Sequence, residues 1–339
     1  MRRPRFGKLL MFLAAGVTAA GLAACSSSST STSSGATAAA SGQGPEKTTI
    51  TVDTLDSADS APLWLAIKNG YFKQQGLTVK INYVQGQALA IPGQAAHTVD
   101  FANQNYSTLY TAMVKTPSLG LRIVAEDEVA GTNTEVIMVP KNSKIKTPAD
   151  LKGKVVGFAS PGVTIGNLAL NEQLKGYGLT GSDYTSDPVG FQAMTQDLAR
   201  GVLDATFAVP PFNTIMETSI GAHQLMNLMT GPMANFPVVG WSTTAWEEQH
   251  YPRTVAAFQR AIVQGQQAAA ASPALVRQIL PPNMKTLSPK VANIMALQSY
   301  VPTLSETSMQ RVATVMEQFH ILPVDFKVQP LIIPLPAGA

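Results

Sequence analysis

Polar residues gather in short loops that follow predicted strands, and their side chains are those in this chain that could bind a small molecule. The loop at residues 55–62 contributes Asp56, Ser57, Asp59 and Ser60, with Trp64 just beyond it. Its hydroxyl groups can donate or accept hydrogen bonds, and the carboxylate of Asp56 could hold a ligand ammonium, which a pure anion binder would not need. The alternative is that Asp59 or Ser60 only caps the following helix, since both residue types are preferred N-caps.

Two further loops supply glycine and side-chain amides. Gly86 and Gln87 follow a strand predicted at 79–84. Glycine lets a backbone approach a ligand closely, and the amide can donate or accept. Another three amides, Asn103, Gln104 and Asn105, follow a short buried strand at 99–102. We expect at least one of the three to contact the ligand, although Asn105 could instead cap the next helix.

The loop at residues 160–164 is the strongest candidate for binding an anion. Its members Ser160, Gly162, Val163 and Thr164 directly precede a helix predicted at 165–175. The free backbone N–H groups and the positive end of a helix attract a sulfonate, phosphate or carboxylate. A further candidate is the pair Pro211 and Phe212 at the start of a later helix, where Phe212 either lines a cleft or belongs to the core.

The same search argues against an enzyme, a metal site and a cofactor. The four histidines lie at 97, 223, 250 and 320, without the spacing of metal ligands, and the chain holds one cysteine. The sequence contains no Gly-x-Ser-x-Gly elbow and no phosphate-binding loop. We interpret the acidic run at 126–128 as a solvated face, as most such runs are, and keep Glu126 as a minor ligand candidate.

The first 47 residues differ from the rest of the chain. A basic start is followed by an apolar stretch from 9 to 22 and by Leu-Ala-Ala-Cys, which ends at Cys25. This is the layout of a secretory signal, and its last four residues resemble the lipobox at which bacterial lipoproteins are cleaved and acylated. We predict a signal peptide at 1–24, a lipid on Cys25 that holds the protein to the bilayer, and a flexible Ser/Thr/Ala/Gly tether at 25–47. The alternative is an ordinary signal peptide with a chance cysteine.

The charge balance gives no indication of a nucleic-acid partner. The formal net charge is +3 over 339 residues, and four of the 24 basic residues belong to the predicted signal. The remaining 20 basic residues face 21 acidic ones, whereas an electrostatic binder of nucleic acid would cluster Lys and Arg on one face. At 45% hydrophobic residues, the chain can build a core.

From residue 48 onward, predicted strands and helices alternate. A first series has strands at 49–53, 79–84, 99–102, 121–125 and 135–140, with helices at 61–72, 88–96 and 106–114. A second series has strands at 154–159, 204–209 and 238–244, with helices at 165–175, 192–200 and 211–219, and then helices at 252–272, 289–300 and 305–319. This alternation indicates an α/β fold with mainly parallel sheets in two lobes.

Four segments resemble solute-binding lipoproteins of the nitrate, sulfonate, taurine and thiamine-precursor importers. The first is Pro62-x3-Ala66-x3-Gly70-Tyr71-Phe72 with Gly76-Leu77-x-Val79, and the second is Val99-Asp100-Phe101. The third and most specific runs from Ile137 through Pro148-Ala149-Asp150-Leu151-Lys152-Gly153 to Gly157. Gly201-Val202-Leu203-Asp204-Ala205 with Pro210-Pro211-Phe212 also fits, so that the resemblance covers about residues 48–275, and the tail from 280 adds little.

The resemblance implies a type II periplasmic-binding-protein clamshell, with two doubly wound α/β lobes joined by two hinge crossings. Lobe 1 would span 48–136, lobe 2 would span 137–237, and 238–339 would return to lobe 1 and supply the C-terminal helices. A ligand would sit in the cleft at the carboxyl ends of the strands, and hinge motion would close the lobes around it.

The resemblance also implies a function. The protein would be an extracytoplasmic monomer that captures a small polar or anionic solute, with a sulfonate or taurine as the first hypothesis, and delivers it to an ABC permease and ATPase. A pyrimidine or thiamine precursor, nitrate and bicarbonate are alternative ligands, and a lipid-anchored solute sensor is an alternative role. A thiamine-pyrimidine synthase is the enzyme alternative, and the lack of clustered cysteines argues against it.

Overall fold

A computed structural model describes residues 44–160, 162–284 and 287–339 of the chain, and residues 44–339 form one compact unit. The predicted signal peptide, the lipidation site Cys25 and most of the predicted tether lie outside the described residues. Within the described ranges, no helix combines the length and the apolar character that crossing a bilayer requires.

A six-stranded sheet forms the first half of the fold, in the order β11-β4-β10-β3-β1-β2. Its strands are β1 (Thr49–Leu55), β2 (Thr78–Val84), β3 (Phe101–Asn105), β4 (Leu121–Val129), β10 (Pro237–Thr244) and β11 (Ser299–Tyr300). β1 pairs in parallel with β2 and β3, whereas β10 runs antiparallel to β3 and β4, and β11 runs antiparallel to β4. The sheet is therefore mixed: β1, β2, β3 and β4 run in one direction, as predicted for a mainly parallel sheet, and β10 and β11 run in the other.

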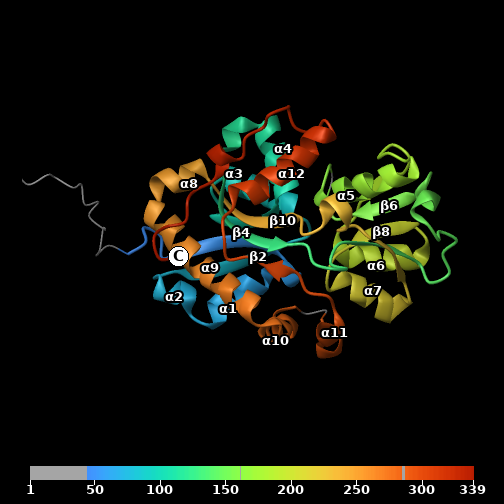
Figure 1. Ribbon diagram of the computed structural model, residues 1–339. Coiled ribbons are helices and arrows are strands. Elements are labelled where there is room, and N and C mark those ends of the chain that lie inside the picture. The colour runs from blue at the N-terminus through green and yellow to red at the C-terminus, as the bar shows by residue number, and fades with distance from the viewer. Residues whose placement is uncertain (1–43, 161, 285–286) are drawn as a thin grey trace, which may run out of the picture. The chain divides into compact units, whose positions relative to one another are not determined.

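Helices cover both faces of this sheet (Figure 1). α1 (Ala61–Lys68), α2 (Tyr71–Gln74), α9 (Pro252–Ala271) and α10 (Pro273–Asn283) lie on one side, and α3 (Ile91–Ala95), α4 (Tyr106–Lys115) and α12 (Glu306–Gln318) lie on the other. α9 is fixed to the sheet by Phe258, whose ring stacks on Phe101 of β3 at 3.8 Å between centroids. Buried aromatic surface of this kind contributes the most to a core per residue.

A five-stranded sheet forms the second half, in the order β7-β6-β8-β5-β9. Its strands are β5 (Val136–Val139), β6 (Val155–Phe158), β7 (Thr185–Pro188), β8 (Ala205–Ala208) and β9 (His223–Asn227), and its helices are α5 (Ile165–Leu174), α6 (Phe191–Arg200) and α7 (Phe212–Ile220). β6 pairs in parallel with β7 and β8, while β5 runs antiparallel to β8 and β9. α6 ends at Gly201, whose φ of +73° only glycine adopts without strain.

Two segments, 130–135 and 228–236, carry the chain from one sheet to the other and back. They run beside each other, because the Ala130 N–H donates to Phe236 O and the Leu228 N–H donates to Glu135 O, each at 2.9 Å. The fold is thus two α/β lobes joined by two crossings, as predicted. We propose that lobe 1 spans 48–136, that lobe 2 spans 137–237 and that 238–339 returns to lobe 1, because the strands change from one sheet to the other close to these positions.

Several elements depart from the prediction. Residues 289–300 are not one helix, because α11 (Pro289–Ile294) ends early and β11 follows it. α8 (Ala245–His250), α10, β7 and β9 were not predicted. β3 begins at Phe101 and includes the three amides that were expected in a loop, and β4 continues through the acidic run to Val129.

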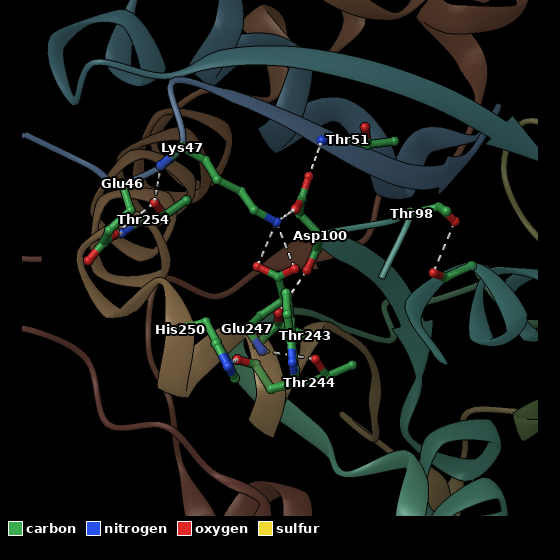
Figure 2. Close-up of polar contacts among 12 residues, drawn as sticks. Glu46, Lys47, Thr51, Thr98, Asp100, Thr243, Thr244, Glu247, His250 and Thr254 are labelled. Carbon is green, nitrogen blue, oxygen red and sulfur yellow. Dashed lines mark hydrogen bonds and ion pairs between the residues drawn. The ribbon is translucent and has the colours of Figure 1, made fainter. Parts of the chain in front are cut away.

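The start of the described chain is tied to the first lobe by an ion-pair cluster (Figure 2). The Lys47 ammonium pairs with the carboxylate of Asp100, and donates to both oxygens of Glu247 at 2.8 and 3.0 Å. Asp100 also accepts from the Thr51 N–H at 2.6 Å, and Glu46 accepts from the Thr254 N–H at 2.8 Å, at the start of α9. These contacts fix β1 and α9 where the predicted tether ends.

Candidate functional site

A cavity lies where the carboxyl ends of strands from both sheets converge. Its volume of about 30 Å³ has room for about two water molecules, so an organic solute can occupy it only when the two lobes part. Its lining comes from the ends of β1, β3, β4, β6 and β8, from the starts of α5, α6 and β10, from the first crossing, and from the turns that hold Asp59 and Gln87: Leu55, Asp59, Gln87, Asn105, Glu128, Glu135, Ala159, Ser160, Thr164, Ile165, Phe191, Phe207, Val209, Val238 and Val239. Open α/β sheets bind ligands at this end of their strands.

Five of the residues predicted from sequence line this cavity: Asp59, Gln87, Asn105, Ser160 and Thr164. The structure does not bring the other eleven to its wall: Asp56, Ser57, Ser60, Trp64, Gly86, Asn103, Gln104, Gly162, Val163, Pro211 and Phe212. Four of the five predicted loops thus contribute to the cavity wall, although most of their other residues do not line it, and their contact with a ligand stays a prediction.

Three carboxyl groups in the lining carry its most unusual chemistry. Asp59 lies in the turn Ala58–Ser60, Glu128 lies in β4 and Glu135 lies in the first crossing, and their exposed fractions are 5%, 2% and 1%. Asp59 accepts a 2.9 Å hydrogen bond from Gln298 Nε2. Glu128 Oε2 and Glu135 Oε2 are buried and accept no hydrogen bond from the described residues. A buried carboxylate without a partner is costly, so these oxygens are available to a ligand donor.

Burial and mutual repulsion change the titration of these groups. Burial raises the pKa of Asp59 to about 6. Burial, and then the charge on Asp59, raises the pKa of Glu128 and of Glu135 well above the usual range. Desolvation disfavours the charged form of a carboxyl group, and a neighbouring negative charge disfavours it further. The cavity therefore retains protons on its carboxyl groups at pH values where exposed carboxylates have lost them.

A series of side-chain hydrogen bonds behind the cavity lining fixes the position of Gln87. Gln87 Nε2 donates to Asn103 Oδ1 at 2.9 Å, and Asn103 Nδ2 donates to Asp127 Oδ2 at 2.8 Å. Asn103 is fully buried in β3 and does not reach the cavity. Its part is to fix the amide of Gln87 and to hold Asp127, whose pKa burial and the charge on Asp59 raise well above the usual range.

The interpretation of the acidic run as a solvated face is wrong. Glu126, Asp127 and Glu128 are all buried within β4, with exposed fractions of 2%, 0% and 2%. Glu126, the one member kept as a ligand candidate, accepts instead from Thr303 Oγ1 at 3.1 Å and from the Ser305 N–H at 2.7 Å. These contacts hold the segment that leads into α12, and Glu128 is the member that lines the cavity.

The loop predicted to bind an anion already satisfies its own helix end. Thr164 caps α5: its Oγ1 accepts from the Asn167 N–H, and its N–H and Oγ1 donate to Asn167 Oδ1 at 3.0 and 2.8 Å. Two of the polar groups that an anion would use are therefore occupied within the helix start. Ser160 and Thr164 line the cavity, whereas Gly162 and Val163 do not.

Close approach of two loops next to the cavity explains Gly86. A Cβ atom at this position would lie 2.5 Å from Ser160 Oγ and 2.7 Å from Ala159 O, closer than side chains pack. Only glycine allows the loop after β2 to pass this near to the loop after β6. Gly86 thus shapes the cavity although its backbone does not line it.

Other predicted ligand contacts have structural roles. Ser60 Oγ donates to Leu55 O at 2.6 Å, and Gln104 Oε1 accepts from Ser242 Oγ at 2.8 Å. Trp64 Nε1 donates to Tyr83 Oη at 3.2 Å, beside a separate hollow on the first lobe. Phe212 stacks on Phe191, with 4.9 Å between ring centroids, and so supports a ring that lines the cavity.

The remaining lining is apolar and aromatic. Phe191 and Phe207 both line the cavity, with their ring centroids 6.3 Å apart, and aliphatic side chains from β1, α5, β8 and β10 complete the wall. None of the described lining residues is a lysine, an arginine or a histidine. Among residues 44–160, 162–284 and 287–339, no group of three or more His, Cys, Asp or Glu is arranged to hold a metal ion. The site can therefore accept a solute that combines N–H donors with an apolar body.

The C-terminal tail supports this site, which sequence reasoning did not foresee. Gln298 bonds to Asp59, and Tyr300 Oη donates to Ala58 O at 2.8 Å. Both contacts hold the 3-10 turn that presents Asp59. Their residues lie about 240 positions downstream of that turn, so no local pattern could have paired them.

Comparisons with known proteins agree with this architecture. The sequence model of the family described as NMT1/THI5 like matches residues 57–275. A Haemophilus influenzae protein named "Putative thiamine biosynthesis protein" is 30% identical over 160 residues, 47% of this chain and 49% of that protein. The 4-amino-5-hydroxymethyl-2-methylpyrimidine phosphate synthase of Aspergillus parasiticus is 27% identical over 150 residues, 43% of this chain and 40% of the synthase. The matched segments thus span about half, or less, of these relatives.

A solved structure extends the likeness to nearly the whole described chain. The alkanesulfonate-binding protein of Xanthomonas axonopodis pv. citri, solved with MOPS, superposes with a TM-score of 0.72 at 18% identity. The superposition covers 85% of this chain and 99% of that protein. At this low identity the superposition establishes the fold alone, which is that of the periplasmic solute-binding proteins.

Proposed function

Because the chain belongs to the NMT1/THI5-like family and has the periplasmic solute-binding fold, we propose that it is the extracytoplasmic solute-binding component of an ABC importer. In this proposal the lipid on Cys25 anchors it to the membrane, and it passes its ligand to a permease driven by an ATPase. The two lobes, their two crossings and the cavity at the strand ends support the assignment.

We further propose that the solute is a small, amine-bearing molecule with an apolar or aromatic body, such as an aminopyrimidine. The observation that carries this proposal is the set of three buried carboxyl groups in the lining, two of them with an unpartnered oxygen. An exocyclic amine beside a ring nitrogen matches a carboxyl group with two parallel hydrogen bonds. The names of the two relatives, one in thiamine biosynthesis and one that makes an aminopyrimidine phosphate, point the same way.

A sulfonate, the first hypothesis from sequence, receives less support from this cavity. A desolvated anion is stabilised by nearby positive charge, and the described lining holds three carboxyl groups and no lysine, arginine or histidine. Taurine keeps some support, because its ammonium could meet the carboxylates. Nitrate and bicarbonate have only negative charge to offer and fit least well.

An enzymatic role on this fold is the second candidate, because one relative is named as a synthase. None of the four histidines lines the cavity, and His97 and His250 instead stack on Trp246 at 4.1 and 4.3 Å between centroids. These placements favour binding over catalysis. A solute sensor would use the same clamshell, and association with a permease rather than a receptor would distinguish the two.

Differential scanning fluorimetry on the purified protein tests the ligand class. The panel contains 4-amino-5-hydroxymethyl-2-methylpyrimidine, taurine, ethanesulfonate, nitrate and bicarbonate. A ligand that binds only the folded state raises the melting temperature as its concentration rises. We expect the aminopyrimidine to give the largest shift. A shift from ethanesulfonate or nitrate with none from the aminopyrimidine would contradict the proposed ligand class.

A further inference from the structure

The three carboxyl groups of the lining come from three different segments of the chain. Asp59 lies in the turn before α1, Glu128 lies near the end of β4, and Glu135 lies in the first crossing. All three face one cavity of about 30 Å³. Glu128 Oε2 and Glu135 Oε2 are fully enclosed there without a hydrogen-bond donor from the described residues.

The charged and titratable groups around this set are acids and phenols. β4 adds Asp127 and Glu126, α4 adds Tyr106 and Tyr110, and β11 adds Tyr300. Besides burial, the charges of Asp59, Asp127 and Glu135 raise the pKa of Glu128, and the charge of Asp59 raises the pKa of Glu135. No described lysine, arginine or histidine is among the groups that act on the three lining carboxyls. Within the described residues, no cation of the protein therefore balances the negative charge of these three carboxyl groups.

Such a set loses at most its most acidic proton, that of Asp59, until a positive charge arrives. Several carboxylates cannot be ionised together in a small desolvated space, because each destabilises the charge on the next. A protonated amine that enters the cavity supplies the missing positive charge and keeps its own protons. One carboxylic acid then loses its proton to solvent, and the carboxylate and the ammonium form a charge-assisted hydrogen bond.

We propose that this protein captures a cationic ligand head and releases about one proton from the carboxyl set of Asp59, Glu128 and Glu135 as it does so. The inference rests on the proposed function and adds the charge of the ligand head and the coupling. A binding event that releases one proton tightens about tenfold for each unit of pH increase, until the carboxyl group ionises in the free protein. Affinity for a cation would thus rise from acidic to neutral pH.

The test uses ethylammonium as the cationic probe and ethanesulfonate as its matched anion with the same two-carbon body. Dissociation constants are measured between pH 5 and 8 by thermal shift, and proton release is measured by calorimetry in two buffers of different ionisation enthalpy. We expect ethylammonium to bind up to tenfold more tightly per pH unit, with about one proton released. We expect ethanesulfonate not to bind.

Two variants assign the proton. Glu128→Gln and Glu135→Gln keep the side-chain shape and remove one titrating group each, and thermal melts verify that each variant folds. Each should weaken ethylammonium binding and reduce its dependence on pH. Ethylammonium binding with a pH-independent affinity would overturn the coupling and leave amine recognition intact. Binding of ethanesulfonate, with no binding of ethylammonium or the aminopyrimidine at any pH tested, would overturn both the coupling and the proposed ligand class.

Discussion

The substitution Asp59→Asn isolates the energetic cost of one cavity carboxylate. The pKa of Asp59 is about 6 in the folded protein against an ordinary 3.8, chiefly because the group is buried. Because the pKa is raised, the folded state holds the proton of Asp59 more tightly than the unfolded state does. The resulting stability is fully present below pH 3.8 and is lost as the pH rises through 6. A shift of about 2 pKa units corresponds to about 3 kcal/mol of unfolding free energy. Asparagine cannot ionise, and its Oδ1 can still accept from Gln298.

We therefore expect the unfolding free energy of the wild type to fall more steeply between pH 4 and 8 than that of Asp59→Asn, by about 3 kcal/mol. In thermal melts the difference is about 5 °C for a chain of this size. Denaturant unfolding at pH 4, 6 and 8 measures the slope, with the exposed Asp325→Asn as the matched control. The same slope in Asp59→Asn and the wild type would refute the claim that this buried carboxyl is forced to retain its proton.

Three further changes test other parts of the account. Gly86→Ala places a Cβ atom 2.7 Å from the carbonyl oxygen of Ala159 and should weaken aminopyrimidine binding at least tenfold in calorimetry. The control Gly176→Ala adds a Cβ atom in open space and should leave the affinity unchanged. Equal affinities of the two variants would contradict a role of Gly86 in shaping the cavity. Lys47→Met leaves two carboxylates without their cation and should lower the unfolding free energy by about 2 kcal/mol in denaturant unfolding, given the partial exposure of the lysine. The control Lys327→Met removes one side of an exposed pair and should leave the unfolding free energy unchanged. Equal losses in the two variants would show that the cluster around Lys47 has no special role. Thr164→Asp keeps a good helix cap and adds a carboxyl group to the cavity lining. It should not weaken aminopyrimidine binding in calorimetry, and a loss of that affinity would contradict the claim that an acidic lining selects an amine.

Most elements of the fold could be predicted from sequence because their signals are local. The strands predicted at 49–53 and 79–84 fall within β1 and β2, and the helix predicted at 192–200 ends with α6 at Arg200. The helix predicted at 61–72 is instead divided at Gly70 into α1 and α2. The register of β10 against β3 and β4 depends on partners over 100 residues away, so the mixed sheet could not be read from any one window. The helix predicted at 289–300 failed because its second half pairs with β4 as β11, which is a tertiary contact.

The sequence predicted several loops that line the cavity, but it did not predict the buried carboxyl groups of the lining. Polar residues after strands identified Asp59, Gln87 and Ser160 correctly as neighbours of a cavity. The acidic run at 126–128 was predicted to be exposed, because runs of charged residues usually are. It is buried because β4, which contains it, is an inner strand of its sheet. One local signal could have corrected this: Val129 after Glu128 continues the strand beyond the acids.

Isothermal titration of the wild type with 4-amino-5-hydroxymethyl-2-methylpyrimidine and with ethanesulfonate, repeated on Glu128→Gln, tests the central claim most directly. The account predicts that the aminopyrimidine binds the wild type, that Glu128→Gln weakens it at least tenfold, and that ethanesulfonate binds neither protein. Tighter binding of ethanesulfonate than of the aminopyrimidine, left unchanged or strengthened in Glu128→Gln, would contradict the claim that this acidic cavity selects an amine-bearing solute.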